Sequence, residues 1–110
     1  MMIRNKKILI FGSRGFIGSK FCEKISSKNI VIKPLFKKLK SNYINLSNFN
    51  SQKINYLIKK NNFDYILNFH AHTDVRYSNF NPRYDFYHNC SLTHSIIHAL
   101  IKNKSKAFFL

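Results

Sequence analysis

Apolar runs alternate with amphipathic segments along the 110-residue chain, and this alternation predicts a parallel sheet covered by helices on both sides. The continuous apolar run Ile8–Phe11 is typical of a central strand that is covered on both faces, and Phe63–Phe69 is a second strongly apolar strand. Further strands are expected at 29–32, where Pro34 ends the strand, at 42–46 and at 107–110. Helices are expected at 19–28, from about 49 to 60 and from about 82 to 102.

The apolar positions of each expected helix indicate which face packs on the sheet. The helix before residue 60 should turn Ile54, Leu57 and Ile58 inward after a cap at Ser47 or Asn48. The other two inward faces are predicted to be Phe21, Cys22, Ile25 and Ser26 in the first helix, and Phe86, Cys90, Thr93, Ile97 and Leu100 in the long one. Residues 35–41 and 70–81 are expected to be connections, the first of them basic.

A glycine turn follows the first strand, and it contains every glycine of the chain: Gly12, Gly15 and Gly18. Gly12 can take a tight turn, and Gly15 leaves room for a pyrophosphate. Gly18 lets the next helix lie close to the strand, so that its first amides face the anion. The spacing is G-x-x-G-x-x-G, and its position between an apolar and an amphipathic run favours dinucleotide binding over a merely flexible turn.

The second strand is not followed by a carboxylate, which would hold the ribose 2′-hydroxyl of NAD. Residues 33–38 read KPLFKK, and cationic groups tolerate the 2′-phosphate of NADP. The sequence after this strand therefore favours NADP.

The large net charge of the chain does not change the prediction of dinucleotide binding. A net charge of +15 raises nucleic-acid binding as a possibility, but Lys outnumbers Arg and the lysines are spread over helix faces and loops. Abundant Asn, Ile, Lys, Phe and Tyr with scarce Ala and Gly favour the compositional bias of an AT-rich genome over a functional basic surface. No apolar run is long enough for a membrane span, so we expect a soluble, cytoplasmic chain without membrane partners.

Three residue pairs resemble functional sites, and we interpret each as structural. Cys22 and Cys90 are far apart and lie among apolar neighbours, which predicts reduced, buried thiols. His94 and His98 have ligand spacing, but no Cys or Glu joins them, so no metal site is predicted. The pair Tyr56 and Lys60 satisfies Y-x-x-x-K, but its helix should lie away from the carboxyl ends of the strands, where ligands bind.

Three segments resemble the N-terminal cofactor half of the NAD-dependent epimerase/dehydratase family, the extended short-chain dehydrogenases. They are KILIFGSRGFIGSK, DYILNFHAHTDVRYSNFNP and DFYHNCSLTHSIIHALIKNKSKAFFL. The resemblance implies an α/β fold with a Rossmann-like, doubly wound parallel sheet, truncated after the fifth strand. The short link between the second and third strands is similar to the dTDP-4-dehydrorhamnose reductase and GDP-fucose synthase branches.

The resemblance also implies a set of cofactor-binding residues. Asn89 matches an Asn that steadies the active-site backbone, whereas the bulky His70 and Leu92 depart from the family's small residues. Arg14 resembles an arginine that reaches the 2′-phosphate, which strengthens the expectation of NADP over NAD. The full set is Gly12, Ser13, Arg14, Gly15, Phe16, Ile17, Gly18, Lys33, Asn45, Leu46, Phe69, His70, Ala71, His72 and Asn89.

By resemblance, residues 1–110 are a partial NAD(P)-binding domain of an oxidoreductase or isomerase that acts on nucleotide sugars for surface polysaccharides. The family's catalytic Tyr and Lys would lie beyond Leu110, so the chain alone is expected to be inactive and to bind dinucleotide weakly or not at all. It is either a fragment of a longer enzyme or a degenerate product, and pairing of two copies through the long helix stays open. The alternative is a non-catalytic nucleotide- or RNA-binding module on the same fold.

Overall fold

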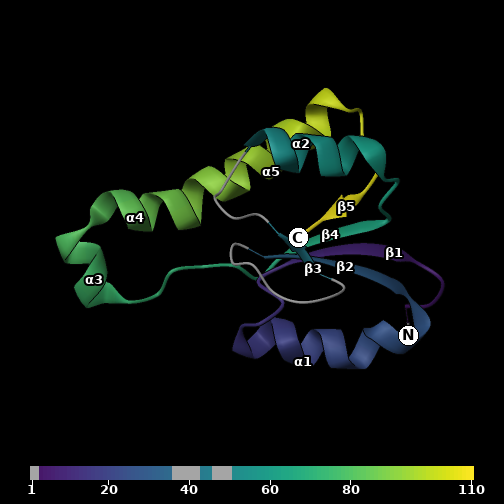
Figure 1. Ribbon diagram of the computed structural model, residues 1–110, viewed down its shortest axis with the longest axis horizontal. Coiled ribbons are helices and arrows are strands. Elements are labelled where there is room, and N and C mark those ends of the chain that lie inside the picture. The colour runs from purple at the N-terminus through teal and green to yellow at the C-terminus, as the bar shows by residue number, and fades with distance from the viewer. Residues whose placement is uncertain (1–2, 36–42, 46–50) are drawn as a thin grey trace.

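The computed structural model describes residues 3–35, 43–45 and 51–110 and shows a parallel sheet between two layers of helices (Figure 1). The strands are β1 (Lys7–Phe11), β2 (Ile30–Leu35), β3 (Tyr43–Asn45), β4 (Tyr65–Asn68) and β5 (Phe108–Phe109), in the order β3-β2-β1-β4-β5. All described pairings are parallel. This order places the first strand at the centre, as in the doubly wound folds that bind nucleotides, and confirms the predicted fold class.

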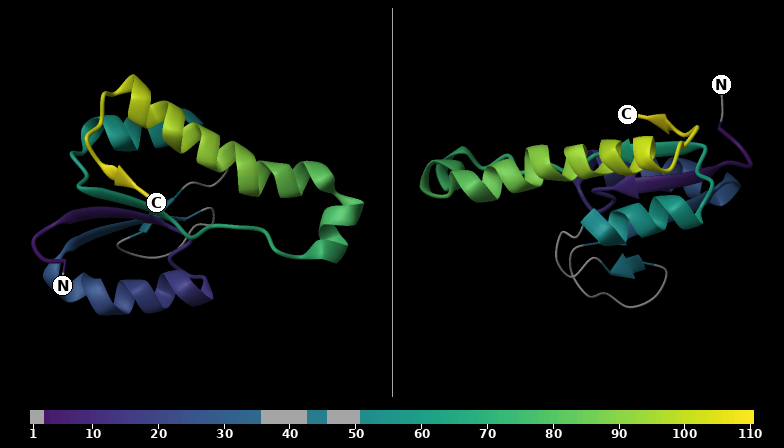
Figure 2. Two further views of the ribbon diagram at one scale, coloured as in Figure 1. Left: turned by 180° about the vertical axis from the view of Figure 1, so that it is seen from behind. Right: turned by 90° about the horizontal axis from the view of Figure 1, so that it is seen from above.

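The helices are α1 (Phe16–Ile25), α2 (Ser51–Lys60), α3 (Val75–Phe80), α4 (Pro82–Phe86) and α5 (Leu92–Lys102). A 3₁₀ turn, η1 (Ser26–Lys28), follows α1, and a π-helical turn, η2 (Tyr87–Ser91), joins α4 to α5. The helices α3 and α4 form an arm that projects away from the sheet (Figure 2). No helix in the described ranges is long and apolar enough to cross a membrane.

Two apolar cores lie on the two faces of the sheet, as the sequence pattern predicts. On one face α1 packs Cys22 and Ile25 against Ile8 and Ile10 of β1 and Leu67 of β4. On the other face α2 and α5 cover the sheet through Ile54, Leu57, Ile58, Leu92, Ile96 and Ala99 (Figure 1). Because β1 contributes side chains to both cores, its four residues from Ile8 to Phe11 are fully buried.

Pro34 does not end the second strand, contrary to the prediction. The backbone N–H of Ile30 donates to Lys6 O, so the backbone N–H groups of the even-numbered residues of β2 are directed toward β1. The pairing of β1 with β2 ends at Ile32. Pro34 therefore lies beyond this ladder on that side and is paired in register with Ile44 of β3. Its missing N–H removes no described hydrogen bond of the sheet.

The predicted inward face of the long helix is wrong at Phe86, Cys90 and Ile97, whereas Leu100 packs against the core as predicted. Cys90 is exposed instead of buried, as are Phe86 and Ile97, whereas Leu92 and Ile96 are buried. The prediction assumed one 3.6-residue period across residues 82–102. The π-helical turn η2 breaks this period, so the residues before and after it do not share one face.

Other element boundaries also differ from the prediction, and β4 and β5 are shorter than expected. The first helix begins at Phe16 instead of Ser19, and its N-cap residue, Gly15, supplies no capping side chain. The expected loop 70–81 contains the helix α3. The third strand is confirmed over Tyr43–Asn45. The predicted cap at Ser47 or Asn48, the site residue Leu46 and most of the basic connection lie outside the described residues.

Candidate functional site

The glycine turn lies at the carboxyl end of β1 and is held by close backbone contacts. Gly12 has φ +76°, which favours glycine, and a Cβ there would lie 2.5 Å from the backbone N of His70. A Cβ on Gly18 would lie 2.1 Å from Gly12 O, so the start of α1 can approach the turn only because Gly18 has no side chain. Gly15 N donates to Gly12 O over 3.1 Å and closes the turn.

The N-terminus of α1 is the part of this turn that is best suited to bind an anion. No side chain caps it, its first turn carries no acidic residue, and Phe16 and Ile17 are exposed there. Ser13 is 6% exposed, and its Oγ has no hydrogen-bond partner in the described part of the chain. A buried hydroxyl without a partner is costly, and an oxygen-rich ligand beside the turn would be able to accept a hydrogen bond from Ser13.

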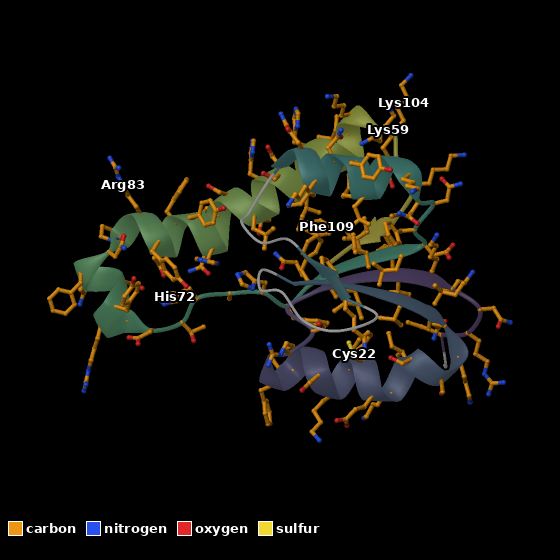
Figure 3. All side chains as sticks on the ribbon, viewed as in Figure 1. Cys22, Lys59, His72, Arg83, Lys104 and Phe109 are labelled. Atoms are coloured by element: carbon orange, nitrogen blue, oxygen red, sulfur yellow. The ribbon has the colours of Figure 1, made fainter. Side chains whose placement is uncertain are left out.

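A shallow pocket of about 220 Å³ lies beside the turn, between α1 and β2. Ser13, Ser19, Cys22, Glu23, Ser26 and Lys33 line it, so the fold brings Lys33 next to the glycine turn. Cys22 is buried, as predicted, and points from α1 toward the sheet (Figure 3). Burial raises the pKa of its thiol, and the nearby Lys33 ammonium partly opposes this shift.

The segment after β4 runs directly past the glycine turn. Phe69 donates its amide to Phe11 O over 2.9 Å, and this contact extends the pairing of β1 with β4 into the site. Asn68, the last residue of β4, accepts the His70 amide at Oδ1 and donates from Nδ2 to Thr93 Oγ1. The end of β4 is thereby tied both to the turn and to α5.

The arm is held to this segment by a polar cluster. Asn89 accepts the backbone amide of His72 over 2.7 Å and donates to the His72 carbonyl over 3.0 Å. Asp85 Oδ1 accepts from Ser78 Oγ over 2.8 Å and from Asn89 Nδ2 over 3.1 Å, and it lies 3.3 Å from His72 Nδ1. The hydrogen bond from Ser78 and, to a smaller extent, the one from His72 lower the pKa of Asp85. His72 lies below α4 in Figure 3.

A histidine pair links the same loop to η2. His70 Nε2 lies 2.8 Å from His88 Nδ1, and the two ring centroids are 5.1 Å apart. Burial, and then the neighbouring His88 and His72, lower the pKa of His70 to about 4. Burial, and then His72, also lower the pKa of His88. The pair is therefore neutral at pH 7, with one ring donating to the other.

We expect the chain to lose stability as the pH falls from about 6.5 to 4. The unfolded state binds a proton at His70 near pH 6.5, whereas the folded state binds it only near pH 4. The loss at pH 4.5 should be about 1–2 kcal/mol, reduced from 1.36 kcal/mol per pKa unit because solvent reaches part of the ring. Urea unfolding at pH 7 and pH 4.5 measures it.

The control for this experiment is His70→Asn, which lacks the titrating group but keeps a polar side chain. Its unfolding free energy should depend less on pH between 6.5 and 4 than that of the original chain. Equal pH dependence in the two chains would show that His70 titrates in the fold as it does in a peptide. The Asp85 contribution is distinguishable, because its lowered pKa places that loss below about pH 4.

Most of the predicted site residues gather at this edge of the sheet. The glycine turn supplies Gly12, Ser13, Arg14, Gly15, Phe16, Ile17 and Gly18; Lys33 lies beside it, and Phe69 and His70 pass it. Ala71 is exposed, while His72 and Asn89 bind each other. Asn45 lies in β3, and Leu46 is outside the described residues.

Sequence reasoning missed the partners of these residues: Asn68, Ser78, Asp85, His88 and Thr93. A signal for Asp85 was present, because it stands four residues before Asn89 in a chain with only four acidic residues.

The other candidate pairs lie elsewhere. Tyr56 is exposed on α2, with Lys60 Nζ 5.6 Å from its ring centroid, and α2 ends at the edge opposite the glycine turn (Figure 1). The rings of His94 and His98 stack 6.3 Å apart on α5. Over residues 3–35, 43–45 and 51–110, no group of three or more His, Cys, Asp or Glu side chains could hold a metal ion.

Several solved structures share this fold at low sequence identity. A hypothetical dTDP-4-dehydrorhamnose reductase from Sulfolobus tokodaii has a TM-score of 0.80 and 22% identity over 94% of this chain and 38% of its own. UDP-glucose-4-epimerase from Stenotrophomonas maltophila, with bound NAD and formylated UDP-arabinopyranose, has a TM-score of 0.75 and 20% identity over 96% and 36%. A Bacillus anthracis dTDP-4-dehydrorhamnose reductase in complex with NADP has a TM-score of 0.74 and 14% identity over 97% and 36%.

The chain spans little more than a third of the length of these structures, so they show its fold. No curated protein matches it by sequence. The family model described as NAD dependent epimerase/dehydratase family matches residues 8–110, which is nearly the whole chain. This match, together with the strand order and the glycine turn, shows that the chain belongs to the NAD-dependent epimerase/dehydratase family.

Proposed function

We propose that residues 1–110 form the dinucleotide-binding part of a nucleotide-sugar epimerase, dehydratase or reductase, and that they bind NADP in preference to NAD. The proposal rests mainly on the glycine turn at the carboxyl end of β1, residues 12–18, which we call the cofactor cradle. There, Gly12 has a left-handed backbone, Gly18 touches the turn, and Ser13 has a buried hydroxyl without a partner among the described residues. These features fit a pyrophosphate next to the uncapped N-terminus of α1.

Each part of the cradle has a role in this proposal. The first amides of α1 and the Ser13 hydroxyl would donate to the pyrophosphate oxygens. Arg14, which is exposed, and Lys33, beside Ser13, would attract the 2′-phosphate that distinguishes NADP. The segment Phe69–His72 would pass the riboses and nicotinamide, with Asn89 holding its backbone in place. The bound cofactor supplies hydride transfer at C4 of its nicotinamide ring.

The substrate class in this proposal comes from the related enzymes, whose structures include complexes with UDP-linked sugars. A place in the synthesis of surface polysaccharides agrees with that class. We propose no catalytic residue among the 110, because Tyr56 and Lys60 lie away from the cradle.

Thermal unfolding with NADP and with NAD tests the proposal. A ligand that binds only the folded state at ten times its Kd adds about 1.4 kcal/mol, which raises Tm by about 5 °C or more in a domain of this size. NADP should reach this shift at a lower concentration than NAD, and Arg14→Gln should reduce the difference without changing the Tm of the free chain. Equal shifts would refute the NADP preference, and no shift with either dinucleotide would refute cofactor binding.

A further inference from the structure

The edge of the sheet opposite the cofactor cradle carries much of the chain's positive charge. In a parallel sheet every strand starts, and every covering helix ends, at this edge (Figure 1). Nine of the 19 Lys and Arg residues lie there, and we call this set the basic edge: Arg4, Lys6, Lys7, Lys28, Lys59, Lys60, Lys102, Lys104 and Lys106. Residues that are scattered along the sequence are therefore gathered by the topology.

These charges form a row across four neighbouring strands. In spatial order, Lys28 precedes β2, Lys6 precedes β1 and Lys7 begins it, Lys59 stands in the last turn of α2, which leads to β4, and Lys106 precedes β5. Adjacent strands lie about 4.8 Å apart, so the row extends for roughly 14 Å. Figure 3 shows Lys59 and Lys104 close together at this end of the molecule, with their side chains directed outward.

The acidic residues do not neutralise this row. Glu23 pairs with Lys20, Asp74 caps α3, and Asp85 belongs to the cluster at the arm. Asp64 is the one acidic residue at the basic edge, and its Oδ2 accepts the backbone amide of Lys7. Within the described residues, Lys59, Lys104 and Lys106 form no ion pair.

Helix dipoles explain only some of these lysines. Lys59, Lys60 and Lys102 stand in the last turns of α2 and α5, where a cation complements the partial negative charge of the helix end. Lys104 and Lys106 lie after α5 and outside its helical turns, as Arg4 and Lys6 lie before β1. Lys104 has φ +50°, at a position where helices commonly place glycine.

A cavity of about 650 Å³ opens in the middle of the basic edge. Lys59, Lys104 and Lys106 line it together with Asn61, Asn62, Asn103 and the acidic residue Asp64. This volume is within the range of sites that hold a ligand of nucleotide size. Three lysines around such a cavity suit phosphate oxygens.

Aromatic rings flank the basic edge on both faces of the sheet. Tyr56 is 61% exposed on α2 and stacks under Lys60. Phe108 is 61% exposed at the start of β5, with its ring centroid 6.1 Å from that of Tyr65. Cationic grooves with neighbouring aromatic rings bind single-stranded nucleic acid, because bases stack on the rings while the cations follow the phosphates.

We infer that the basic edge is a binding site for the phosphodiester backbone of single-stranded nucleic acid, separate from the cofactor cradle and independent of the proposed function. The cradle is at the carboxyl ends of the strands and the basic edge at their amino ends, so dinucleotide and nucleic acid do not compete. Binding depends on salt, because each phosphate contact releases counterions.

Fluorescence anisotropy of a labelled single-stranded RNA of about 16 nucleotides, the upper end of the site sizes of related modules, tests this inference. The test variant K59Q/K104G/K106Q removes three charges of the basic edge, and glycine suits the left-handed backbone at position 104. The control K20Q/K53Q/R76Q removes three exposed charges from other parts of the surface. Thermal unfolding of both variants checks that they are folded.

The basic-edge variant should lower the slope of log K against log salt by about 2, since each single-strand phosphate contact contributes about 0.7. The control should keep the slope of the original chain, duplex RNA should bind more weakly than single strands, and NADP should leave RNA binding unchanged. Equal weakening by both variants would overturn the inference, because total charge would then explain binding. Displacement of the RNA by inorganic phosphate as effectively as by unlabelled RNA would overturn it as well.

Discussion

Replacing Gly18 with alanine should destabilise the chain by about 4 kcal/mol, near the upper limit for a single substitution. The new Cβ would lie 2.1 Å from the carbonyl oxygen of Gly12 and 2.9 Å from its carbonyl carbon. Both are backbone atoms and cannot rotate away as a flexible side chain would. Urea unfolding of the Gly18→Ala variant measures the loss.

The turn cannot relieve this clash by moving away from α1. On its other side Gly12 faces the backbone of Phe69 and His70, where even one added carbon would come within 2.5 Å. Displacement of the turn would therefore disturb the contact between β1 and β4. The cost includes strained packing on both sides of the turn.

Gly15→Ala is the matched control in the same turn. Gly15 has φ −70°, which any residue adopts, and a Cβ there would lie 3.4 Å from Gly12 O, an ordinary contact. Its unfolding free energy should change by less than about 1 kcal/mol, the typical effect of a changed helix cap. Similar losses for both variants would contradict the assignment of close packing to Gly18 alone.

Features set by short stretches of sequence were predictable. The apolar run of β1 and the three glycines after it are contiguous, so the strand, the turn and the following helix could be inferred together. The inward positions of α2 were predicted correctly, because Ile54, Leu57 and Ile58 follow one uninterrupted helical period. The family resemblance rested on the same local segments, and the family match confirms it.

Features set by contacts between distant segments were not predictable. Hydrophobic periodicity placed Phe86 and Cys90 inside, but the sheet does not extend under this part of the chain. The inward positions there belong to Asp85 and Asn89, which bind the loop after β4. A rule that places apolar residues inside fails where the neighbouring surface is a polar backbone segment.

Pro34 shows the same limit. Proline usually ends a strand, and only the register of β2 against β1 shows that its missing amide lies beyond the last paired residue. The positive charges are a third case, because their gathering at one edge follows from strand order.

The cluster at Asn89 has the second largest expected effect. Asn89→Ala removes both hydrogen bonds to the His72 backbone and one to Asp85. Groups in a half-buried site that lose their partners cost about 1–3 kcal/mol each, and partial access of water lowers the sum. We expect a loss of about 3 kcal/mol in unfolding free energy and faster amide hydrogen exchange at His72.

Two variants distinguish the bonds of Asn89 from a general effect of polar side chains on the arm. Asn79→Ala, an exposed site in α3, should change stability by less than about 0.5 kcal/mol. Asn89→Asp keeps an acceptor for the His72 amide but loses the donor and places a second carboxylate beside Asp85, so it should not restore stability. If Asn89→Ala left hydrogen exchange at His72 unchanged, Asn89 would not hold this backbone segment, and the arm would depend on the His70–His88 pair for its connection to the sheet.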